Sequence, residues 1–176
     1  MRRIIFHVDV NSAFLSWEAV YRLRHLGGTL DLRTIPSAVG GDQEKRHGII
    51  LAKSIPAKKY KVQTGEPIVD ARAKCPQLML VPPNYELYQR SSKAMIRILS
   101  EYTDQIEKYS IDEAFLDMTG ICQEPKETAE KLKEQIFREL GFTVNVGISS
   151  NKLLAKMASD FEKPDRVHTL WPEEIP

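Results

Sequence analysis

The sequence lacks most features of secreted and membrane proteins. Only two of its 176 residues are cysteines, Cys75 and Cys122. They are isolated and match no metal-ligand spacing, which is typical of a reducing, cytoplasmic setting without disulfides. No apolar run approaches the roughly 18 residues of a membrane span, so we expect no membrane partner. The first apolar run, residues 4–8, is too short for a signal-peptide core and predicts a buried strand.

An excess of charge of one sign is also missing. The sequence has 25 Lys and Arg against 24 Asp and Glu, a formal net charge of +1. Overall charge therefore gives no indication of nucleic-acid binding, and any such argument must rest on local clusters. The sequence has no internal repeat or low-complexity segment, and its length suits one core or two small lobes.

The first half of the chain predicts short elements that end at a lobe boundary, Pro82-Pro83. We expect strands at 3–9, 35–39, 48–53 and 78–81, a helix at 12–24 that Gly27-Gly28 ends, a charged turn at 41–46, a basic turn or short helix at 56–61, and a helix between Pro67 and Pro76.

The second half predicts longer, cleaner elements. These are helices at 85–102, 126–140 and 151–162, and strands at 105–110, 114–118 and 143–148. With residues 12–83 set aside, the order becomes strand, helix, strand, strand, helix, strand. That order is the split βαβ, or ferredoxin-like, arrangement of an α+β fold. Residues 1–11 and 84–176 would form it, and 12–83 would be a small inserted α/β lobe.

Three acidic residues converge in this topology. Right-handed crossovers place the first and third strands side by side and antiparallel in the centre of the sheet. Asp9 ends the first strand, and Asp112 and Glu113 begin the third. Carboxylates this close resist ionisation unless a cation lies between them. Hard divalent cations such as Mg²⁺ prefer oxygen ligands and keep positions open for phosphate, so a metal site is one interpretation.

Simpler interpretations remain open on spacing alone. An Asp at a strand end is commonly a turn residue or a helix cap, and an Asp-Glu pair at a hairpin turn is equally ordinary. Phe14, at helical spacing from its apolar neighbours, suits a plain helix core. Lys152, Lys156 and Lys163 would fall within roughly 40° on one helix face, which could hold phosphates or simply face solvent.

Three segments, in order, resemble the motifs of lesion-bypass (Y-family) DNA polymerases of the ImpB/MucB/SamB, UmuC/DinB-like type. Residues 8–14, VDVNSAF, are similar to the opening motif. Residues 109–117, YSIDEAFLD, match the pattern S-I-D-E-A-[FY]-x-D. Residues 146–156, VGISSNKLLAK, are similar to the later G-I-[SA]-x-[NT]-K-x-[LF]-A-K segment. The resemblance covers nearly the whole chain and implies a palm (1–11 and 84–176) and fingers (12–83), with thumb and little finger absent.

The resemblance also implies roles for single residues. The catalytic acids would be Asp9, Asp112 and Glu113, which with the backbone carbonyl of Val10 would bind two Mg²⁺ ions, replaceable by Mn²⁺. Phe14 would be the steric gate that abuts the sugar C2′ and excludes a ribose hydroxyl. The implied nucleotide-binding residues are Asn11, Ser12, Ala13, Phe14, Lys58 and Lys163, and Lys152 and Lys156 are candidate phosphate contacts.

The fingers depart from the family pattern Y-x-A-R-K-[FY]-G. Ile55 replaces the Tyr, Lys58 the Arg and Lys61 the Gly. Lysine cannot make the bidentate arginine contact, which puts the triphosphate grip in doubt. Residues 51–54 and 84–88 are more similar to the UmuC-type than to the DinB-type branch, so we favour the UmuC-type placement.

The implied activity is low-fidelity DNA synthesis past damaged bases in the cytoplasm, as part of the SOS response to DNA damage. The implied partners are primer–template DNA, an incoming dNTP, and a sliding clamp that binds C-terminal segments absent here. The chain ends without a closing element, so we expect a fragment that alone binds DNA poorly and is inactive. The alternatives are a catalytically silent DNA-binding or regulatory relative and, less favoured, a nucleotide cyclase.

Overall fold

The computed structural model describes residues 1–41 and 48–176. The charged turn expected at 41–46 lies, from Asp42 onward, outside the described residues. The chain divides into two compact units, one formed by Met1–Asn11 with Gln89–Pro176 and one by Ser12–Tyr88. Among the described residues, no helix is both long and apolar enough to cross a membrane.

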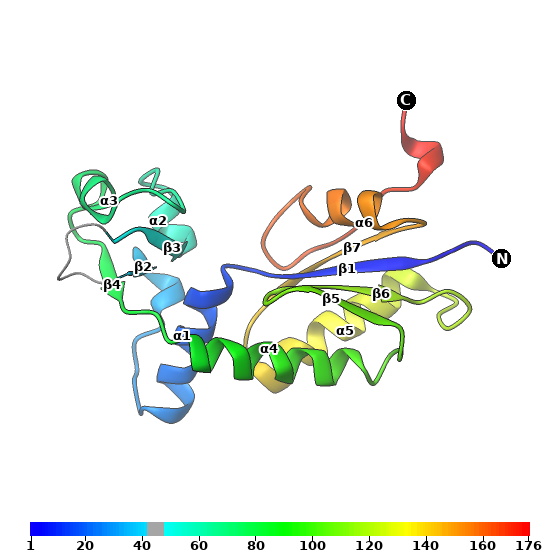
Figure 1. Ribbon diagram of the computed structural model, residues 1–176, viewed down its shortest axis with the longest axis horizontal. Coiled ribbons are helices and arrows are strands. Elements are labelled where there is room, and N and C mark those ends of the chain that lie inside the picture. Colours follow the sequence, from blue (N-terminus) through cyan, green and yellow to red (C-terminus); the bar gives the residue numbers. More distant parts are fainter. Residues whose placement is uncertain (42–47) are drawn as a thin grey trace. The chain divides into compact units, whose positions relative to one another are not determined.

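The first unit is built on a five-stranded sheet in the order β5-β6-β1-β7-β8 (Figure 1). Strand β1 is antiparallel to both neighbours, β6 and β7, while β8 is parallel to β7. The predicted central pair of first and third strands is therefore confirmed, and so is the ferredoxin-like α+β fold. The short edge strand β8 was not predicted. The strand bounds are Ile5–Val10 (β1), Ile106–Ser110 (β5), Glu113–Asp117 (β6), Val144–Ser149 (β7) and Val167–Thr169 (β8).

Helices cover both faces of this sheet, with α5 on one side and α6 on the other (Figure 1). Helix α5 (Pro125–Leu140) buries Leu132 and Ile136 and ends at Gly141, whose φ of 84° suits glycine. Helix α6 spans Lys152–Ser159, and η3 is a 3₁₀ turn at Pro172–Glu174. Helix α4 (Tyr85–Leu99) includes the boundary between the two units.

Helix α6 lies unusually close to strand β7. A Cβ atom added at Gly147 would lie 1.9 Å from the carbonyl oxygen of Ala155 and 2.5 Å from the nitrogen of Ser159. Only glycine allows the helix backbone to approach the strand this closely. Gly147 therefore sets the position of α6, which supplies Lys156 and Ser159.

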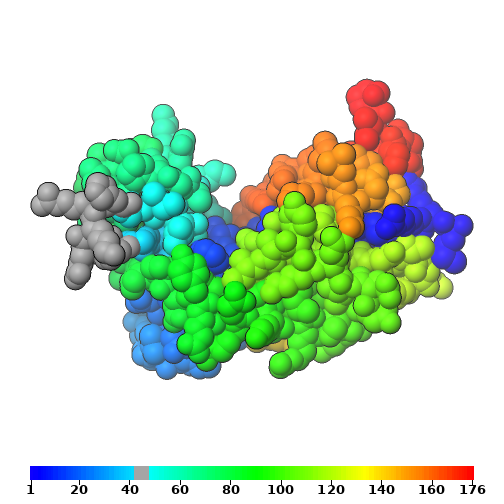
Figure 2. All heavy atoms as spheres, in the orientation of Figure 1, coloured from blue at the N-terminus to red at the C-terminus, as the bar shows by residue number. Residues whose placement is uncertain are grey.

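Residues near the two ends of the chain contact each other in the first unit. The guanidinium of Arg2 lies 3.8 Å from the centre of the Trp171 ring and forms an ion pair with Glu173 at 2.7 Å. In Figure 2 the C-terminal residues, in red, lie beside the N-terminal ones, in blue. A cation–π contact at an exposed site contributes about 0.5–1 kcal/mol. This contact therefore stabilises the surface locally and adds little to the stability of the core.

The second unit has a small three-stranded sheet in the order β3-β2-β4. Ser54 organises its turn: its hydroxyl donates to the carbonyl of Ile35 (2.7 Å) and accepts from the amides of Ser37 (3.0 Å) and Ala57 (3.1 Å). The element bounds are Ala13–His25 (α1), Leu32–Thr34 (η1), Ser37–Gly40 (β2), Ile50–Lys53 (β3), Ile55–Lys58 (α2), Ile68–Lys74 (α3) and Met79–Val81 (β4).

Two predicted helices end earlier than expected. Helix α4 ends at Leu99 rather than residue 102, and α6 ends at Ser159 rather than residue 162. At α6 the Asn145 amide donates to the carbonyls of Ser159 (2.9 Å) and Glu162 (2.7 Å), and Pro164 cannot continue a helix. Lys163 is thus not on the helix, and the prediction of one lysine face is wrong for that residue.

Candidate active site

The site is centred on the ladder between β1 and β6. Asp9 and Glu113 are paired opposite each other in the antiparallel register. Asp112 lies in the turn just before β6, and its carbonyl accepts a hydrogen bond from the amide of Val10 (3.0 Å). Strand pairing therefore brings the three predicted acids to one edge of the sheet, although more than 100 positions separate Asp9 from the other two.

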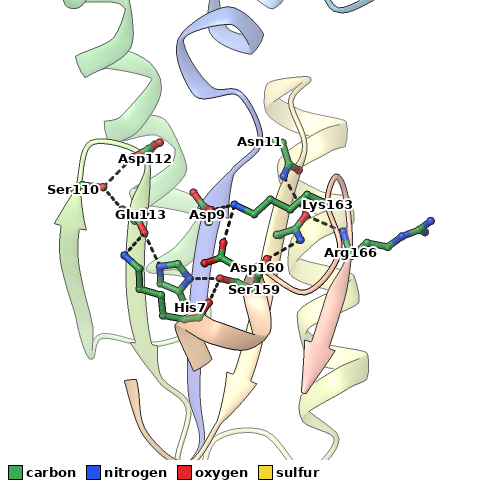
Figure 3. Close-up of polar contacts among 12 residues, drawn as sticks. His7, Asp9, Asn11, Ser110, Asp112, Glu113, Ser159, Asp160, Lys163 and Arg166 are labelled. Carbon is green, nitrogen blue, oxygen red and sulfur yellow. Dashed lines mark hydrogen bonds and ion pairs between the residues drawn. The ribbon is translucent and has the colours of Figure 1, made fainter. Parts of the chain in front are cut away.

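Asp9 is buried and forms an ion pair with Lys163 (Figure 3). Lys163 also lies 3.1 Å from Asp160. Burial, reinforced by the nearby charges of Asp112 and Glu113, raises the pKa of Asp9 to about 6 against the opposing effect of Lys163. Burial would lower the pKa of Lys163, but the contact with Asp9 raises it. The ion pair thus only partly offsets the desolvation of the carboxylate.

Glu113 has three side-chain partners. Its Oε1 lies 2.9 Å from Lys156 Nζ and 3.1 Å from His7 Nε2, and its Oε2 lies 3.0 Å from Ser110 Oγ. Burial opposes ionisation, but the contacts with Lys156 and Ser110 outweigh it and lower the pKa of Glu113. Glu113 is therefore held ionised and fixed in place, whereas the pKa of Asp9 is raised.

His7 supports Glu113 from inside the sheet. Its Nδ1 lies 2.7 Å from Ser159 Oγ, which also lies 2.7 Å from the carbonyl oxygen of Lys156. An ionised carboxylate can only accept, so His7 Nε2 donates to Glu113. Nδ1 of the neutral ring is then an acceptor for the Ser159 hydroxyl, whose one proton it shares with the Lys156 carbonyl. Burial lowers the pKa of His7, against the raising effect of Glu113.

Ser110 links the remaining acid to the site. Its hydroxyl lies 2.9 Å from Asp112 Oδ1 and 3.0 Å from Glu113 Oε2 (Figure 3). A single hydroxyl has one proton, so it can donate fully to only one of these carboxylates at a time. Ser110 therefore keeps the two acids within reach of each other without neutralising either.

Asn11 fastens the segment that contains Lys163. Its amide donates to Asn145 Oδ1 (3.1 Å), and its Oδ1 accepts from the Thr143 hydroxyl (2.9 Å) and the Asp165 amide (3.0 Å). Asn145 is fully buried, and its Oδ1 also accepts from the Arg166 amide (3.2 Å). Two asparagines thus anchor both ends of the turn around Lys163.

The other candidate lysines differ in their surroundings. Lys152 forms an ion pair with Glu107, and both side chains are about half exposed. The ammonium of Lys156 lies 4.5 Å from the centre of the Tyr109 ring as well as beside Glu113. Lys152, Lys156 and Lys163 are therefore each paired with an acid.

Four predicted site residues belong to the second unit. Ser12 precedes α1 with a left-handed φ of 45°, and Ala13 is buried. Phe14 is partly buried, and its ring stacks on Tyr88 with centroids 4.3 Å apart and planes 9° apart. Lys58 is exposed at the end of α2, where its charge helps lower the pKa of Lys53 after the larger effect of burial.

The acids of the site are, by chemical type, suitable ligands for a hard metal ion. Carboxylate oxygens are the ligands that Mg²⁺ prefers, and Asp9, Asp112 and Glu113 lie along one edge of the sheet. Within residues 1–41 and 48–176, however, no three His, Cys, Asp or Glu side chains are gathered closely enough to hold an ion. Lys163 and Lys156 occupy the carboxylates instead, so a metal would have to displace Lys163 from Asp9.

The sequence interpretation did not identify four of these residues: His7, Ser110, Asn145 and Ser159. For two of them the sequence contained a pattern that could have identified them. His7 is two positions before Asp9 on a strand and so faces the same side. Asn145 is a polar residue within an otherwise buried, largely apolar strand. For Ser110 and Ser159 it contained none, because the bulge between β5 and β6 and the close approach of α6 decide their roles.

Comparison with known proteins agrees with this architecture. The model of the impB/mucB/samB family matches residues 8–160. DNA polymerase IV of Clostridium acetobutylicum is 54% identical over 99% of this chain and 44% of its own length. DinB from Sulfolobus solfataricus has a TM-score of 0.84 at 30% identity, covering 98% of this chain and 49% of that one. A Y-family DNA polymerase chimera has a TM-score of 0.85, at 97% and 49% coverage.

The fold and the site define a member of the Y-family polymerases. The chain belongs to the impB/mucB/samB family. It spans less than half the length of these relatives. Their names favour the DinB-type over the UmuC-type branch that we predicted from residues 51–54 and 84–88. Those short segments weigh less than identity along the whole chain.

Proposed function

We propose that this chain is the palm and fingers of a DNA-directed DNA polymerase that copies damaged templates with low fidelity. The observation that supports this most directly is the pairing of Asp9 with Glu113 across the central strands, with Asp112 joined to Glu113 through Ser110. The palm would comprise 1–11 and 84–176 and the fingers 12–83, although the boundary between the compact units falls after Tyr88.

Asp9, Asp112, Glu113 and the carbonyl of Val10 would hold two Mg²⁺ ions, and Mn²⁺ is expected to substitute. When bound, such ions promote attack of the primer 3′-hydroxyl on the α-phosphate and stabilise the leaving pyrophosphate. The protein contributes the orientation of the acids. His7, Lys156 and Ser110 fix Glu113, and Asp9 would have to leave its ion pair with Lys163 to bind a metal. Lys163 would then be available for the triphosphate, as the resemblance implies.

The nucleotide would be bound by Asn11, Ser12, Ala13, Phe14, Lys58 and Lys163, with Phe14 excluding the ribose hydroxyl. Asn11 would act at least partly through the turn that it fastens around Lys163. Lys58 offers a single ammonium charge where the family has an arginine that makes two parallel hydrogen bonds. Binding of the triphosphate by the fingers would therefore be weaker. Lys156 would keep Glu113 in place, and Lys152 remains a candidate phosphate contact.

The complete protein would bind primer–template DNA and an incoming dNTP, and a sliding clamp through segments outside this chain. Its relatives include a bacterial DNA polymerase IV, and bacterial chromosomes lie in the cytoplasm, so we place its action there, within the SOS response to DNA damage. This chain alone has a net charge of +1. Phosphate contacts supply most non-specific DNA affinity, so it should bind DNA weakly by itself.

Two other functions have less support. A silent DNA-binding relative would not need the acids, yet all three are present and Glu113 is held ionised by its neighbours. A nucleotide cyclase would share the paired acids but would not need the fingers unit or the Phe14 gate. DNA binding without synthesis would favour the first, and a cyclic product formed without template would favour the second.

Primer extension tests the proposal. The complete natural protein should extend a primer on an undamaged template with Mg²⁺ and dNTPs, while an Asp112→Ala, Glu113→Ala variant should not. A Glu127→Ala, Glu134→Ala variant is a matched control, because it removes two exposed acids from α5 without touching the site. Equal extension by the wild type and the Asp112→Ala, Glu113→Ala variant would refute the assignment of the acids. DNA binding without extension by any of them would favour the silent relative.

A further inference from the structure

The second unit contains a buried acid to which the proposed function gives no role. Glu18, on helix α1, is only 5% exposed. Glutamate is almost never fully buried without a partner, because desolvating a charge is unfavourable. Glu18 is four positions after Phe14, so the two side chains project from the same side of the helix.

A tyrosine from α4 satisfies this acid. The hydroxyl of Tyr88 donates to Glu18 Oε1 at 2.9 Å, and Arg22 Nε lies 3.8 Å from Glu18 Oε2. Tyr88 is fully buried, and burial raises the pKa of its phenol well above the usual range. The phenol therefore stays protonated and acts as the donor, which leaves the carboxylate of Glu18 as the acceptor.

Tyr88 in turn sets the plane of the Phe14 ring. The two rings are stacked with centroids 4.3 Å apart and planes 9° apart. Trp17 packs at a tilt against both, at 6.2 Å from Phe14 and 5.9 Å from Tyr88. A ring held on one face by a fixed neighbour cannot turn without breaking that stack. The hydrogen bond to Glu18 prevents Tyr88 from shifting along with it.

We propose that Glu18 is a positioning residue for sugar selection, acting through Tyr88 to hold the Phe14 ring at the angle that excludes ribonucleotides. This inference rests on the proposed function, in which the Phe14 ring abuts the sugar C2′. Exclusion by contact depends on placement to within about 0.5 Å. A partly exposed ring needs outside support to meet that requirement, and the Glu18–Tyr88 pair supplies it.

The inference predicts a selective effect. If Tyr88 loses its hydrogen bond, the Phe14 ring can yield to a 2′-hydroxyl, so ribonucleotides are accepted more readily. Deoxyribonucleotides have no 2′-hydroxyl to place against the ring, so the efficiency of their incorporation should change little. The ratio of the two efficiencies should therefore fall. A merely structural role for Glu18 and Tyr88 would instead lower both efficiencies together.

The experiment compares kcat/KM for dCTP and CTP opposite one template base, with the complete natural protein. Tyr88→Phe keeps the stacked ring and removes one oxygen atom, and Glu18→Ala removes the acceptor. Both should lower discrimination against CTP by about 10-fold, as expected for one buried hydrogen bond. Glu18→Gln keeps an acceptor oxygen and should restore most of the discrimination.

Tyr102→Phe is the matched control. Its hydroxyl donates to Gln135 at 2.7 Å in the other unit, so the variant loses a comparable hydrogen bond away from Phe14. Its discrimination should equal that of the wild type. A ratio unchanged in Tyr88→Phe would overturn the inference, and this conservative variant decides the matter even where Glu18→Ala fails to fold. A wild type that extends with neither nucleotide would overturn the proposed function, and the inference with it.

Discussion

Lys163 forms an ion pair with Asp9 from a position 154 residues further along the chain. The contact puts an ammonium group where the family resemblance expects a metal ion. Despite this pair, burial raises the pKa of Asp9 to about 6. A carboxylate that is only partly compensated by its neighbours should be sensitive both to pH and to added cations.

The stability of the metal-free protein should depend on the protonation of Asp9. The pKa of Asp9 rises from 3.8 when unfolded to about 6 when folded, so the folded state binds the proton more tightly. Its contribution to stability is complete below pH 3.8 and is lost as pH rises through about 6. The shift corresponds to about 3 kcal/mol. Urea unfolding in the presence of a chelator measures the free energy of unfolding at each pH. It should fall with rising pH in the wild type and not in Asp9→Asn, and the same pH dependence in both would contradict the prediction.

Divalent cations should stabilise the protein more at high pH than at low pH. Mg²⁺ at about 100 times its dissociation constant would add about 2.7 kcal/mol. The gain should be larger at pH 8 than at pH 5, because Asp9 is ionised only above about pH 6. Thermal unfolding with and without Mg²⁺ measures it. The Asp112→Ala, Glu113→Ala variant should lose the gain and Glu127→Ala, Glu134→Ala should keep it; a gain of equal size in all three would place the cation elsewhere.

Gly147→Ala should move helix α6. The added methyl would lie 1.9 Å from the carbonyl oxygen of Ala155, so the helix must shift outward. Overpacking of this kind costs about 1–3 kcal/mol or more. Urea unfolding should show that loss, while Gly41→Ala, where the nearest atom is 3.8 Å away, should change little. Primer extension should also fall, because α6 supplies Lys156 to Glu113. An unaltered stability would mean that α6 is not fixed by this contact.

The sequence predicted the sheet and the meeting of Asp9 with Glu113 well, because both depend on patterns that the chain itself displays. Short apolar runs and right-handed crossovers sufficed to place Asp9 beside Glu113. The lysines were less predictable. Helical spacing aligned Lys163 with Lys152 and Lys156, but α6 ends at Ser159, where the side chain of Asn145 on β7 binds the carbonyls that follow the helix. Similarly, Phe14 looks like an ordinary core residue until the stack on Tyr88 is seen. Long-range side-chain contacts of this kind leave no periodic trace in the sequence.

Asn145→Ala should loosen the segment that contains Lys163. The substitution removes the hydrogen bonds from the buried amide to the carbonyls of Ser159 and Glu162 and from the Arg166 amide to Oδ1. Buried groups left without partners cost about 1–3 kcal/mol each, so residues 160–166 should open locally before the sheet unfolds. Hydrogen exchange followed by mass spectrometry should show faster exchange in that segment.

Asn151→Ala is the matched control for this change. Asn151 accepts from the Leu154 amide at 2.9 Å and caps the other end of α6. Its loss should cost about 1 kcal/mol and fray the first turn of the helix, without affecting exchange at 160–166. If both variants exchange alike in that segment, Asn145 does not hold it. If only Asn145→Ala opens it, the position of Lys163 beside Asp9 is set by a side chain on β7, and the ion pair should weaken in that variant alone.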